Sequence, residues 1–280
     1  MFDLLLIKMG LFSLFARNDA VYMPDSTTFL KNKPYYELYL KIFSVLGIPV
    51  KLLEKQLFSG REAWEAGYES TARTIARENF DFLKSKKVTH IITNSPECYK
   101  MLTKNYSELL PNWNIPVENI WEIILRKLEK RPSLVKVSAQ ETITYHDNCY
   151  LGRYCKIYDE PRQILRLLGY EIQEMNNNRE NSFCCGSCGG LLFVDKVLAN
   201  ALARERLLQA KQINVNKMIV CSFDNYNLLK ENNATIGIEV RELSEVLGKA
   251  LGIEIPLVEV EEINNTNKIS EELVEVEDYE

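Results

Sequence analysis

Short apolar runs alternate with longer amphipathic stretches along most of the chain. The runs are rich in β-branched and aromatic residues, which is typical of strands. Between them, apolar residues recur at intervals of three and four, which indicates helices. Strands are predicted at residues 20–23, 49–53, 88–93, 142–146, 171–175 and 217–221, and helices at 35–45, 62–85, from 99 onwards, 161–168, 198–212 and 225–231. This alternation favours an α/β fold with parallel sheets flanked by helices.

The second half of the pattern repeats the first half. Residues 21–26 correspond to 144–149 at an offset of 123, residues 58–60 to 184–186 and 95–98 to 221–224 at 126, and the Leu-Gly pair at 46–47 to that at 168–169 at 122. A nearly constant offset between separate landmarks indicates an internal duplication. We therefore predict two pseudo-symmetric repeats, residues 1–130 and 131–257, each with a small parallel sheet, and a tail at 258–280.

Charge changes the picture only at the end of the chain. The net charge is −5, but residues 259–280 hold nine acidic residues and one lysine. Such a segment is predicted to be solvated and disordered. The rest of the chain has no broad basic region and no nucleic-acid-binding motif, so nucleic acid is not an expected partner.

The first residues form an apolar segment. Residues 4–15 include Lys8 and are fewer than the roughly 18 apolar residues that a membrane span needs. They also lack the basic start and the cleavage site of a signal peptide. We expect this segment to pack on the fold or on a partner, with membrane contact at most peripheral. Seven cysteines, an odd number, argue against a secreted disulfide scaffold and favour a reducing, cytoplasmic location.

Four cysteines are the candidate site. Cys149, the adjacent pair Cys184 and Cys185, and Cys221 each follow a predicted strand, and Gly186 comes directly after the pair. Ligand loops at the carboxyl ends of parallel strands converge at one edge of a sheet. Soft thiolates select zinc, copper(I) or iron–sulfur clusters. Adjacent cysteines are awkward for one tetrahedral zinc ion, so the sequence favours an iron–sulfur cluster, with structural zinc as the alternative.

Other residues near these cysteines have more than one interpretation. Cys98 and Cys155 are predicted to be core residues, because free cysteine is commonly buried. Cys188 is either a ligand or a bystander. His146 is interpreted as a proton donor, a hydrogen-bond partner of a ligand or a structural residue. Asp224 is an oxygen ligand, a hydrogen-bond acceptor or an exposed residue.

The cysteine pattern resembles the cysteine-rich CCG domain, C-xn-CCG-xn-CxxC, of the B-type and D-type catalytic subunits of heterodisulfide reductases. The same domain occurs in iron–sulfur subunits of glycolate, lactate, glycerol-3-phosphate and succinate-type dehydrogenases. Residues 146–153, 158–162 and 178–183 extend the resemblance beyond the cysteines. The resemblance implies an iron–sulfur oxidoreductase subunit that performs disulfide or thiol chemistry. Its cofactor would be a [4Fe–4S] cluster, cubane or non-cubane.

The resemblance also implies roles for individual residues. Cys149, Cys184, Cys185 and Cys221 would bind the cluster beside Gly186, and Cys184, Cys185 and His146 would be catalytic. In the first repeat the cysteine positions are occupied by non-cysteine residues, and only one cysteine, Cys98, remains. The residues that stand in place of cysteines are Ser26, Phe58, Ser59 and Ser95. That repeat is therefore expected to hold no cluster.

The same resemblance implies partners. The chain contains no C-x2-C-x2-C-x3-C-P run, so we expect electrons to come from other iron–sulfur or flavin subunits of a complex. The expected substrate is a small thiol or disulfide. Two alternatives stay open, an electron-relay or assembly subunit of a dehydrogenase and a zinc-binding structural subunit.

Overall fold

Two parallel sheets with the same strand order form the framework of the protein. The computed structural model describes residues 20–255. The first sheet has the order β1 (Ala20–Tyr22), β2 (His90–Thr93), β3 (Val117–Asn119), and the second has the order β5 (Tyr170–Ile172), β4 (Glu141–Tyr145), β6 (Lys217–Val220), β7 (Glu239–Glu242). All neighbouring strands are parallel. A single parallel bridge between Val21 and Lys51 lies where the second sheet has β5. The predicted α/β fold with two pseudo-symmetric repeats is confirmed.

Helices connect and cover the strands in both repeats. In the first repeat they are α2 (Lys33–Leu46), α3 (Arg61–Glu65), α4 (Glu69–Ser85), α5 (Pro96–Lys100), α6 (Tyr106–Leu109) and α7 (Ile120–Lys130). In the second they are α8 (Asp159–Leu167), α9 (Leu191–Val194), α10 (Lys196–Gln212), α11 (Phe223–Glu231) and α12 (Leu243–Ala250). Short π-helical or 3-10 turns complete the chain: η1 (Thr27–Lys31), η2 (Met101–Asn105), η3 (Pro132–Leu134), η4 (Tyr150–Tyr154) and η5 (Arg179–Asn181). Thus η1 and η4 occupy equivalent places, after the first strand of each repeat.

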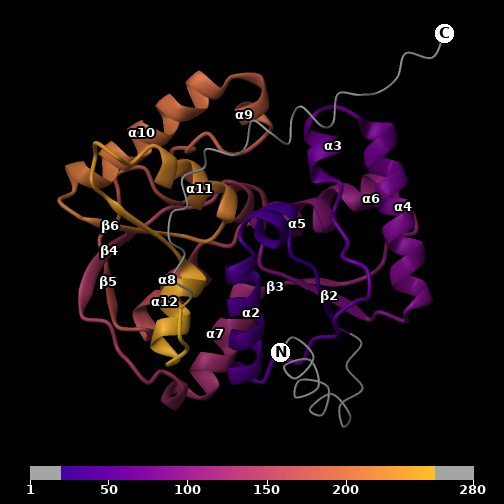
Figure 1. Cartoon of the computed structure of the whole chain (residues 1–280), viewed down its shortest axis with the longest axis horizontal. Coiled ribbons are helices and arrows are strands. Elements are labelled where there is room, and N and C mark those ends of the chain that lie inside the picture. Colours follow the sequence, from indigo (N-terminus) through magenta and orange to yellow (C-terminus); the bar gives the residue numbers. More distant parts are fainter. Residues whose placement is uncertain (1–19, 256–280) are drawn as a thin grey trace.

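Four helices form a layer that the two sheets share. Figure 1 shows α2, α7, α8 and α12 between β4, β5 and β6 on one side and β2 and β3 on the other. Helix α2 contacts α12, and α7 contacts α8. Each contact joins the first helix of one repeat to the last helix of the other. The fully buried Tyr39 and Trp121 belong to this layer, with ring centroids 6.1 Å apart. Its apolar core runs continuously through both repeats, so neither sheet is packed independently of the other.

Longer helices cover the outer faces of the sheets. Helix α4 buries Ala72 and Ala76 against the first sheet, and α10 buries Ala199 and Ala203 in the second repeat. Figure 1 shows both helices on the outside of the molecule, at opposite sides. Small residues on these helix faces allow the two helices to pack closely against the apolar cores beneath them.

Several predicted elements have different bounds in the structure. The strand predicted at 49–53 is only the bridge at Lys51. The helix predicted at 62–85 is interrupted between α3 and α4, where Gly67 has a φ of +84°. The helix expected from residue 99 begins at Pro96, because the Ser95 hydroxyl accepts a hydrogen bond from the Cys98 amide at 3.1 Å. The units β3–α7 and β7–α12 were not predicted.

Two sequence predictions lie outside the described residues. These are the apolar segment at 4–15 and the acidic tail at 258–280. Within residues 20–255, no helix combines the length and the apolar character that crossing a bilayer requires.

The two equivalent Leu-Gly pairs provide a test of the packing. Gly47 and Gly169 both follow a helix with positive φ, +60° and +91°. A Cβ at Gly169 would lie 2.1 Å from the Ser138 hydroxyl and 2.3 Å from the Ala139 carbonyl oxygen, whereas at Gly47 the nearest atom is 3.7 Å away. We expect Gly169→Ala to lower the free energy of unfolding by about 3 kcal/mol, since it adds a clash to the backbone strain. Gly47→Ala, with strain alone, should cost about 1 kcal/mol.

Urea denaturation of the two variants and the wild type measures these differences. Equal destabilisation by both substitutions would contradict the close packing of Gly169 against residues 138 and 139.

Candidate functional site

Three cysteine sulfurs come together at the carboxyl-terminal edge of the second sheet. Cys149 lies in the segment between β4 and η4, and Cys184 and Cys188 lie in the loop between η5 and α9. Their Sγ atoms all lie within 4.8 Å of one another. Cys149 is buried, and the other two are partly exposed. The structure thus groups two of the four predicted ligands with Cys188, whose role the sequence left open.

Hydrogen bonds among the three thiols shift their pKa values in opposite directions. Hydrogen bonds from Cys149, followed by Cys188, lower the pKa of Cys184 to about 2. The pKa values of the other two thiols are raised, that of Cys149 mainly by its hydrogen bond with Cys184 and that of Cys188 mainly by its hydrogen bond with Cys149. Cys184 is thus the thiol of the three whose ionisation its neighbours favour. A metal centre that displaces the remaining protons fits such a donor set, because thiolates are its ligands.

The other two predicted ligands lie outside this group of three. Cys185 is fully buried, and its sulfur accepts a hydrogen bond from the Asn225 side-chain amide at 3.3 Å. Cys221 is also fully buried, and its sulfur accepts from the Tyr145 hydroxyl at 3.1 Å. Burial raises the pKa of Cys185 to about 11 and also raises that of Cys221. Binding of a cofactor by these two residues stays a prediction.

Gly186 brings the cysteine loop against α10. Its φ is +92°, and a Cβ at this position would lie 2.7 Å from the Ala199 carbonyl oxygen. No other residue fits there without a shift of backbone. The backbone of Gly186 also hydrogen-bonds to Cys184, which contributes to the lowered pKa of that thiol.

A buried ion-pair network supports the loops on both sides of the site. Arg162 is fully buried and binds both carboxylate oxygens of Asp147, at 2.6 and 2.8 Å, and both of Glu174, at 2.6 and 2.9 Å. Asp147 lies two residues before Cys149 and also accepts from the Arg179 amide at 2.7 Å. The segment before Cys184 is thereby attached to the segment before Cys149. Bidentate pairs of this kind fix geometry as well as charge.

His146 is fully buried next to a second buried arginine. The Arg206 Nε donates to Nδ1 of His146 at 3.0 Å, so the imidazole proton is on Nε2. Burial, with the charge of Arg206, lowers the pKa of His146 to about 3. The ring is thus neutral and can donate a hydrogen bond but is not an imidazolium acid. A catalytic role of His146 stays a prediction. Arg206, which also binds the Ser182 hydroxyl at 3.3 Å, escaped the sequence analysis because α10 contains several arginines and lysines.

Asp224 contacts the first repeat. Its carboxylate accepts from the Thr27 hydroxyl at 2.6 Å and pairs with Arg61 at 3.0 Å. Of the three interpretations of Asp224, the hydrogen-bond acceptor is correct, and the exposed residue is wrong. Arg61 also pairs with Glu62 and Glu65, at 3.3 and 3.5 Å. An arginine surrounded by carboxylates therefore lies at the boundary between the repeats.

The structure corrects the alignment of the two repeats by one residue. The Tyr145 hydroxyl donates to Cys221, and its counterpart Tyr22 donates to Asn94 at 2.9 Å. The strand registers agree, since β1 pairs Tyr22 with Ile92 and β4 pairs Tyr145 with Ile219. Asn94, rather than Ser95, is thus equivalent to Cys221. The prediction that Ser95 is equivalent to Cys221 is wrong. It assumed an offset of 126 between the repeats, whereas the offset at this strand is 127.

The same register changes the interpretation of Cys98. Its counterpart is Asn225, which follows the helix cap Ser222 by the same interval that separates Cys98 from the cap Ser95. Cys98 is fully buried in the apolar core of the first repeat, as the sequence predicted. Cys155 packs, partly buried, against the shared core. Neither residue belongs to the group of three sulfurs.

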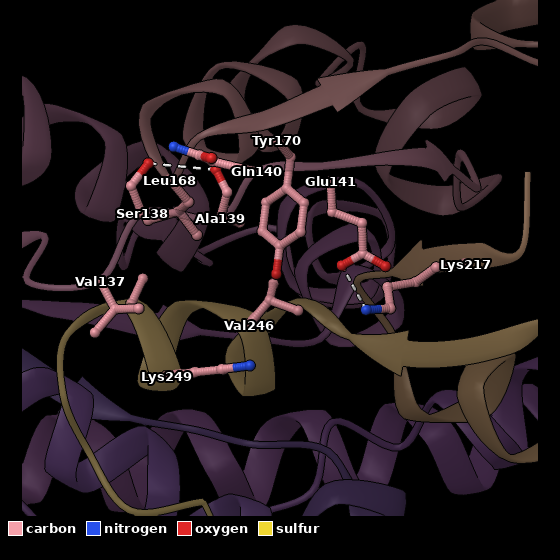
Figure 2. Close-up of a pocket in the computed structure, with 11 residues that line it drawn as sticks. Val137, Ser138, Ala139, Gln140, Glu141, Leu168, Tyr170, Lys217, Val246 and Lys249 are labelled. Carbon is pink, nitrogen blue, oxygen red and sulfur yellow. Dashed lines mark hydrogen bonds and ion pairs between the residues drawn. The ribbon is translucent and has the colours of Figure 1, made fainter.

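A cavity of about 420 Å³ lies at the opposite edge of the second sheet. Figure 2 shows Glu141, Tyr170 and Lys217 among its lining residues. These residues begin β4, β5 and β6, whereas the cysteine loops follow the ends of the same three strands. Among the described residues, no cysteine lines this cavity, so it is separate from the candidate site.

A comparison with known protein families identifies the family of this chain. The sequence model of the CCG cysteine-rich domain matches residues 25–103 and again residues 143–224, together more than half of the chain. The chain therefore belongs to the CCG cysteine-rich domain family, and the expected resemblance is confirmed. The second match includes every cysteine of the candidate site.

Several curated proteins are similar to more than half of this chain. The chain is 29% identical over 178 residues to the probable iron–sulfur-binding oxidoreductase FadF of Bacillus subtilis, covering 63% of this chain and 25% of FadF. It is 26% identical over 230 residues to the D-type polypeptide of the dihydromethanophenazine:CoB–CoM heterodisulfide reductase of Methanosarcina acetivorans, covering 77% and 54%. It is 28% identical over 203 residues to the EtfAB:quinone oxidoreductase of Syntrophomonas wolfei, covering 69% and 28%. The chain spans about half or less of the length of these relatives.

Proposed function

We propose that this protein is an iron–sulfur oxidoreductase subunit that performs disulfide or thiol chemistry at a four-iron cluster within a larger electron-transfer complex. The observation that carries the proposal is the approach of Cys149, Cys184 and Cys188 to within 4.8 Å, inside the second CCG match. All three potential ligand atoms are sulfur, which suits an iron–sulfur centre. The names of the relatives, which include iron–sulfur-binding proteins and oxidoreductases, support the same assignment.

The proposed ligands are Cys149, Cys184, Cys185 and Cys221, with Cys188 added by the geometry. A bound cluster would supply one-electron redox chemistry at this edge of the sheet. The buried Tyr145 hydroxyl and Asn225 amide donate to two of the sulfurs, and such hydrogen bonds tune cluster potential. Structural zinc is the competing occupant, because three sulfurs this close together also suit a single ion.

Metal analysis of anaerobically purified protein tests the proposal. We expect about four iron and four sulfide ions per chain and little zinc, as a four-iron cluster requires. Cys184→Ser should lose most of the iron, because a serine hydroxyl is a poorer ligand for an iron–sulfur cluster than a thiolate. Cys98→Ser is the matched control and should retain the iron, since its sulfur lies in the core of the first repeat.

Cys188, the fifth proposed ligand, is tested by the same metal analysis. Cys188→Ser should lose iron to a similar extent as Cys184→Ser, because its sulfur belongs to the same group. Stoichiometric zinc without acid-labile sulfide would contradict the iron–sulfur assignment. Full iron in Cys188→Ser would remove Cys188 from the ligand set.

Disulfide chemistry is proposed from two features. Cys184 and Cys188 are partly exposed, so a small sulfur compound has access to this edge of the site. One relative is named as part of a heterodisulfide reductase. In the proposed reaction a disulfide accepts two electrons and two protons, its S–S bond breaks, and two thiols leave. The electrons are supplied by a partner subunit that carries iron–sulfur clusters or flavin.

Low-temperature electron paramagnetic resonance separates this reaction from a relay role. We expect small thiols or disulfides added to the oxidised protein to shift its paramagnetic signal, because substrate sulfur would approach the centre. A non-sulfur compound of similar size, such as an alcohol, should leave the signal unchanged. Electron transfer through the protein without any effect of thiols would support the relay alternative and contradict the catalytic proposal.

An exposed apolar surface beside the cysteine loop is the proposed contact with the redox partner. Phe193, Val194 and Val197 are 89%, 85% and 82% exposed, and they begin three residues after Gly190, the last residue of the loop. Contiguous exposed apolar residues are typical of protein interfaces. The relatives are much longer than this chain, which supports a partner domain or subunit. A reducing, cytoplasmic compartment stays part of the proposal, since all seven cysteines are free.

Substitution of this surface tests the partner proposal. We expect Phe193→Ser combined with Val194→Ser to leave thermal stability nearly unchanged, because exposed side chains contribute little. Reduction of the double variant by the partner subunits that copurify with it should be severalfold slower than that of the wild type. Its reduction by dithionite should be unchanged. Leu208→Ser, on the far end of α10, is the control and should transfer electrons normally. Normal transfer in the double variant would exclude this surface as the contact.

A further inference from the structure

A carboxylate of the first repeat is buried next to the cysteine loops of the second. Glu97 lies in α5 and is 1% exposed. Its Oε2 accepts from the Ser95 hydroxyl at 3.0 Å, within its own repeat. Its Oε1 accepts from the Asn148 side-chain amide and from the Ser222 hydroxyl, both at 2.8 Å. The second pair of bonds crosses the boundary between the repeats.

Both partners across the boundary are neighbours of cysteines. Asn148 directly precedes Cys149, and Ser222 directly follows Cys221. Asn148 also shapes the turn at Cys149, since its Oδ1 accepts from the amides of Tyr150 and Leu151 at 2.8 and 3.1 Å. One carboxylate oxygen therefore connects the loop of Cys149 to the loop of Cys221.

The same network reaches the third cysteine loop. The Asn148 amide that donates to Glu97 also donates to Oδ1 of Asn225 at 2.8 Å. The Asn225 amide in turn donates to the Cys185 sulfur at 3.3 Å and to the Ser187 hydroxyl at 2.6 Å. The bond from Asn148 fixes which end of the Asn225 side chain faces Cys185, because it occupies the oxygen and leaves the amide to donate. All three loops are thus connected to Glu97, two of them directly and the third through Asn148 and Asn225.

We propose that Glu97 is a positioning residue for the sulfur site, so that the first repeat completes the site of the second. This inference rests on the proposed iron–sulfur function. Loss of the Glu97 oxygens would leave three buried donors without that acceptor: Asn148 and Ser222 of the second repeat and Ser95 of the first. Buried donors without partners are strongly unfavourable, so the loops would move until water or another group satisfied them. The sulfurs of Cys149 and Cys221 would move with their loops.

Three substitutions in the full-length chain separate positioning from general damage. Glu97→Gln keeps an oxygen for Asn148 and Ser222, and its amide can donate to the Ser95 hydroxyl. Glu97→Ala removes the acceptors. Asp25→Ala is the matched control, because Asp25 is also a buried carboxylate of the first repeat but accepts from within that repeat, from the Thr28 amide at 2.6 Å.

The first measurement is iron content with the low-temperature paramagnetic spectrum. We expect Glu97→Ala to lose at least half of the iron and to show an altered signal. Glu97→Gln and Asp25→Ala should match the wild type in both. Wild-type loading and signal in Glu97→Ala would overturn the proposal. Loss in Glu97→Gln equal to that in Glu97→Ala would also overturn it, because a retained acceptor would then not rescue the site.

The second measurement does not need the metal. Alkylation of the metal-free chain by iodoacetamide, followed by mass spectrometry, reports the exposure of each cysteine. We expect Cys149 and Cys221 to react severalfold faster in Glu97→Ala than in the wild type or Asp25→Ala. Unchanged rates would overturn the positioning role. If the wild type holds no iron, the proposed function fails, and these alkylation rates still decide the role of Glu97.

A milder variant covers the case in which Glu97→Ala does not fold. Ser222→Ala removes one of the two bonds across the boundary without creating a large cavity. We expect faster alkylation of Cys221 with a melting temperature close to that of the wild type. An unchanged rate at Cys221 in this variant counts against the proposal.

Discussion

Burial of the four helices between the sheets is the constraint on which the rest of the structure depends. Helices α2 and α12, and likewise α7 and α8, each join the two repeats through one continuous apolar core. The repeats cannot move apart without exposing that core to water. Consequently the loops after the strands face each other, with α5 against η4 and α11 against η1. The segments beside Cys149 and Cys221 therefore lie against the first repeat.

Polar groups at the boundary satisfy one another across it. Glu97 accepts from the second repeat, and Asp224 accepts from Thr27 and pairs with Arg61 of the first. Burial, followed by the charge of Asp224, raises the pKa of Glu97 to about 7. A boundary that contains several buried carboxylates needs Arg61 nearby to limit their repulsion. The first repeat, whose one cysteine is Cys98, thus contributes buried polar groups to its interface with the second repeat.

Local patterns in the sequence predicted the features that are set by nearby residues, such as strands, helices and the loops that follow them. Strand β4 and helix α10 follow from apolar periodicity, and Cys149 and Cys184 meet because both end up at one sheet edge. Long-range partners had no such signal. The pairing of Arg206 with His146 joins residues 60 positions apart, and that of Asn148 with Glu97 joins residues 51 apart. The place of Cys188 in the group of sulfurs likewise depends on how the glycine-rich loop folds against α10.

The strand register determines where a cysteine equivalent to Cys221 would have to be introduced in the first repeat. A designer guided by sequence offset alone would introduce a thiol at Ser95. That hydroxyl caps α5 and donates to the Glu97 carboxylate, which faces the second repeat, so the change would remove both hydrogen bonds. Asn94 instead lies beside the hydroxyl of Tyr22, as Cys221 lies beside that of Tyr145. A second sulfur site designed in the first repeat would therefore begin with a cysteine at position 94, which leaves the Ser95 cap of α5 in place.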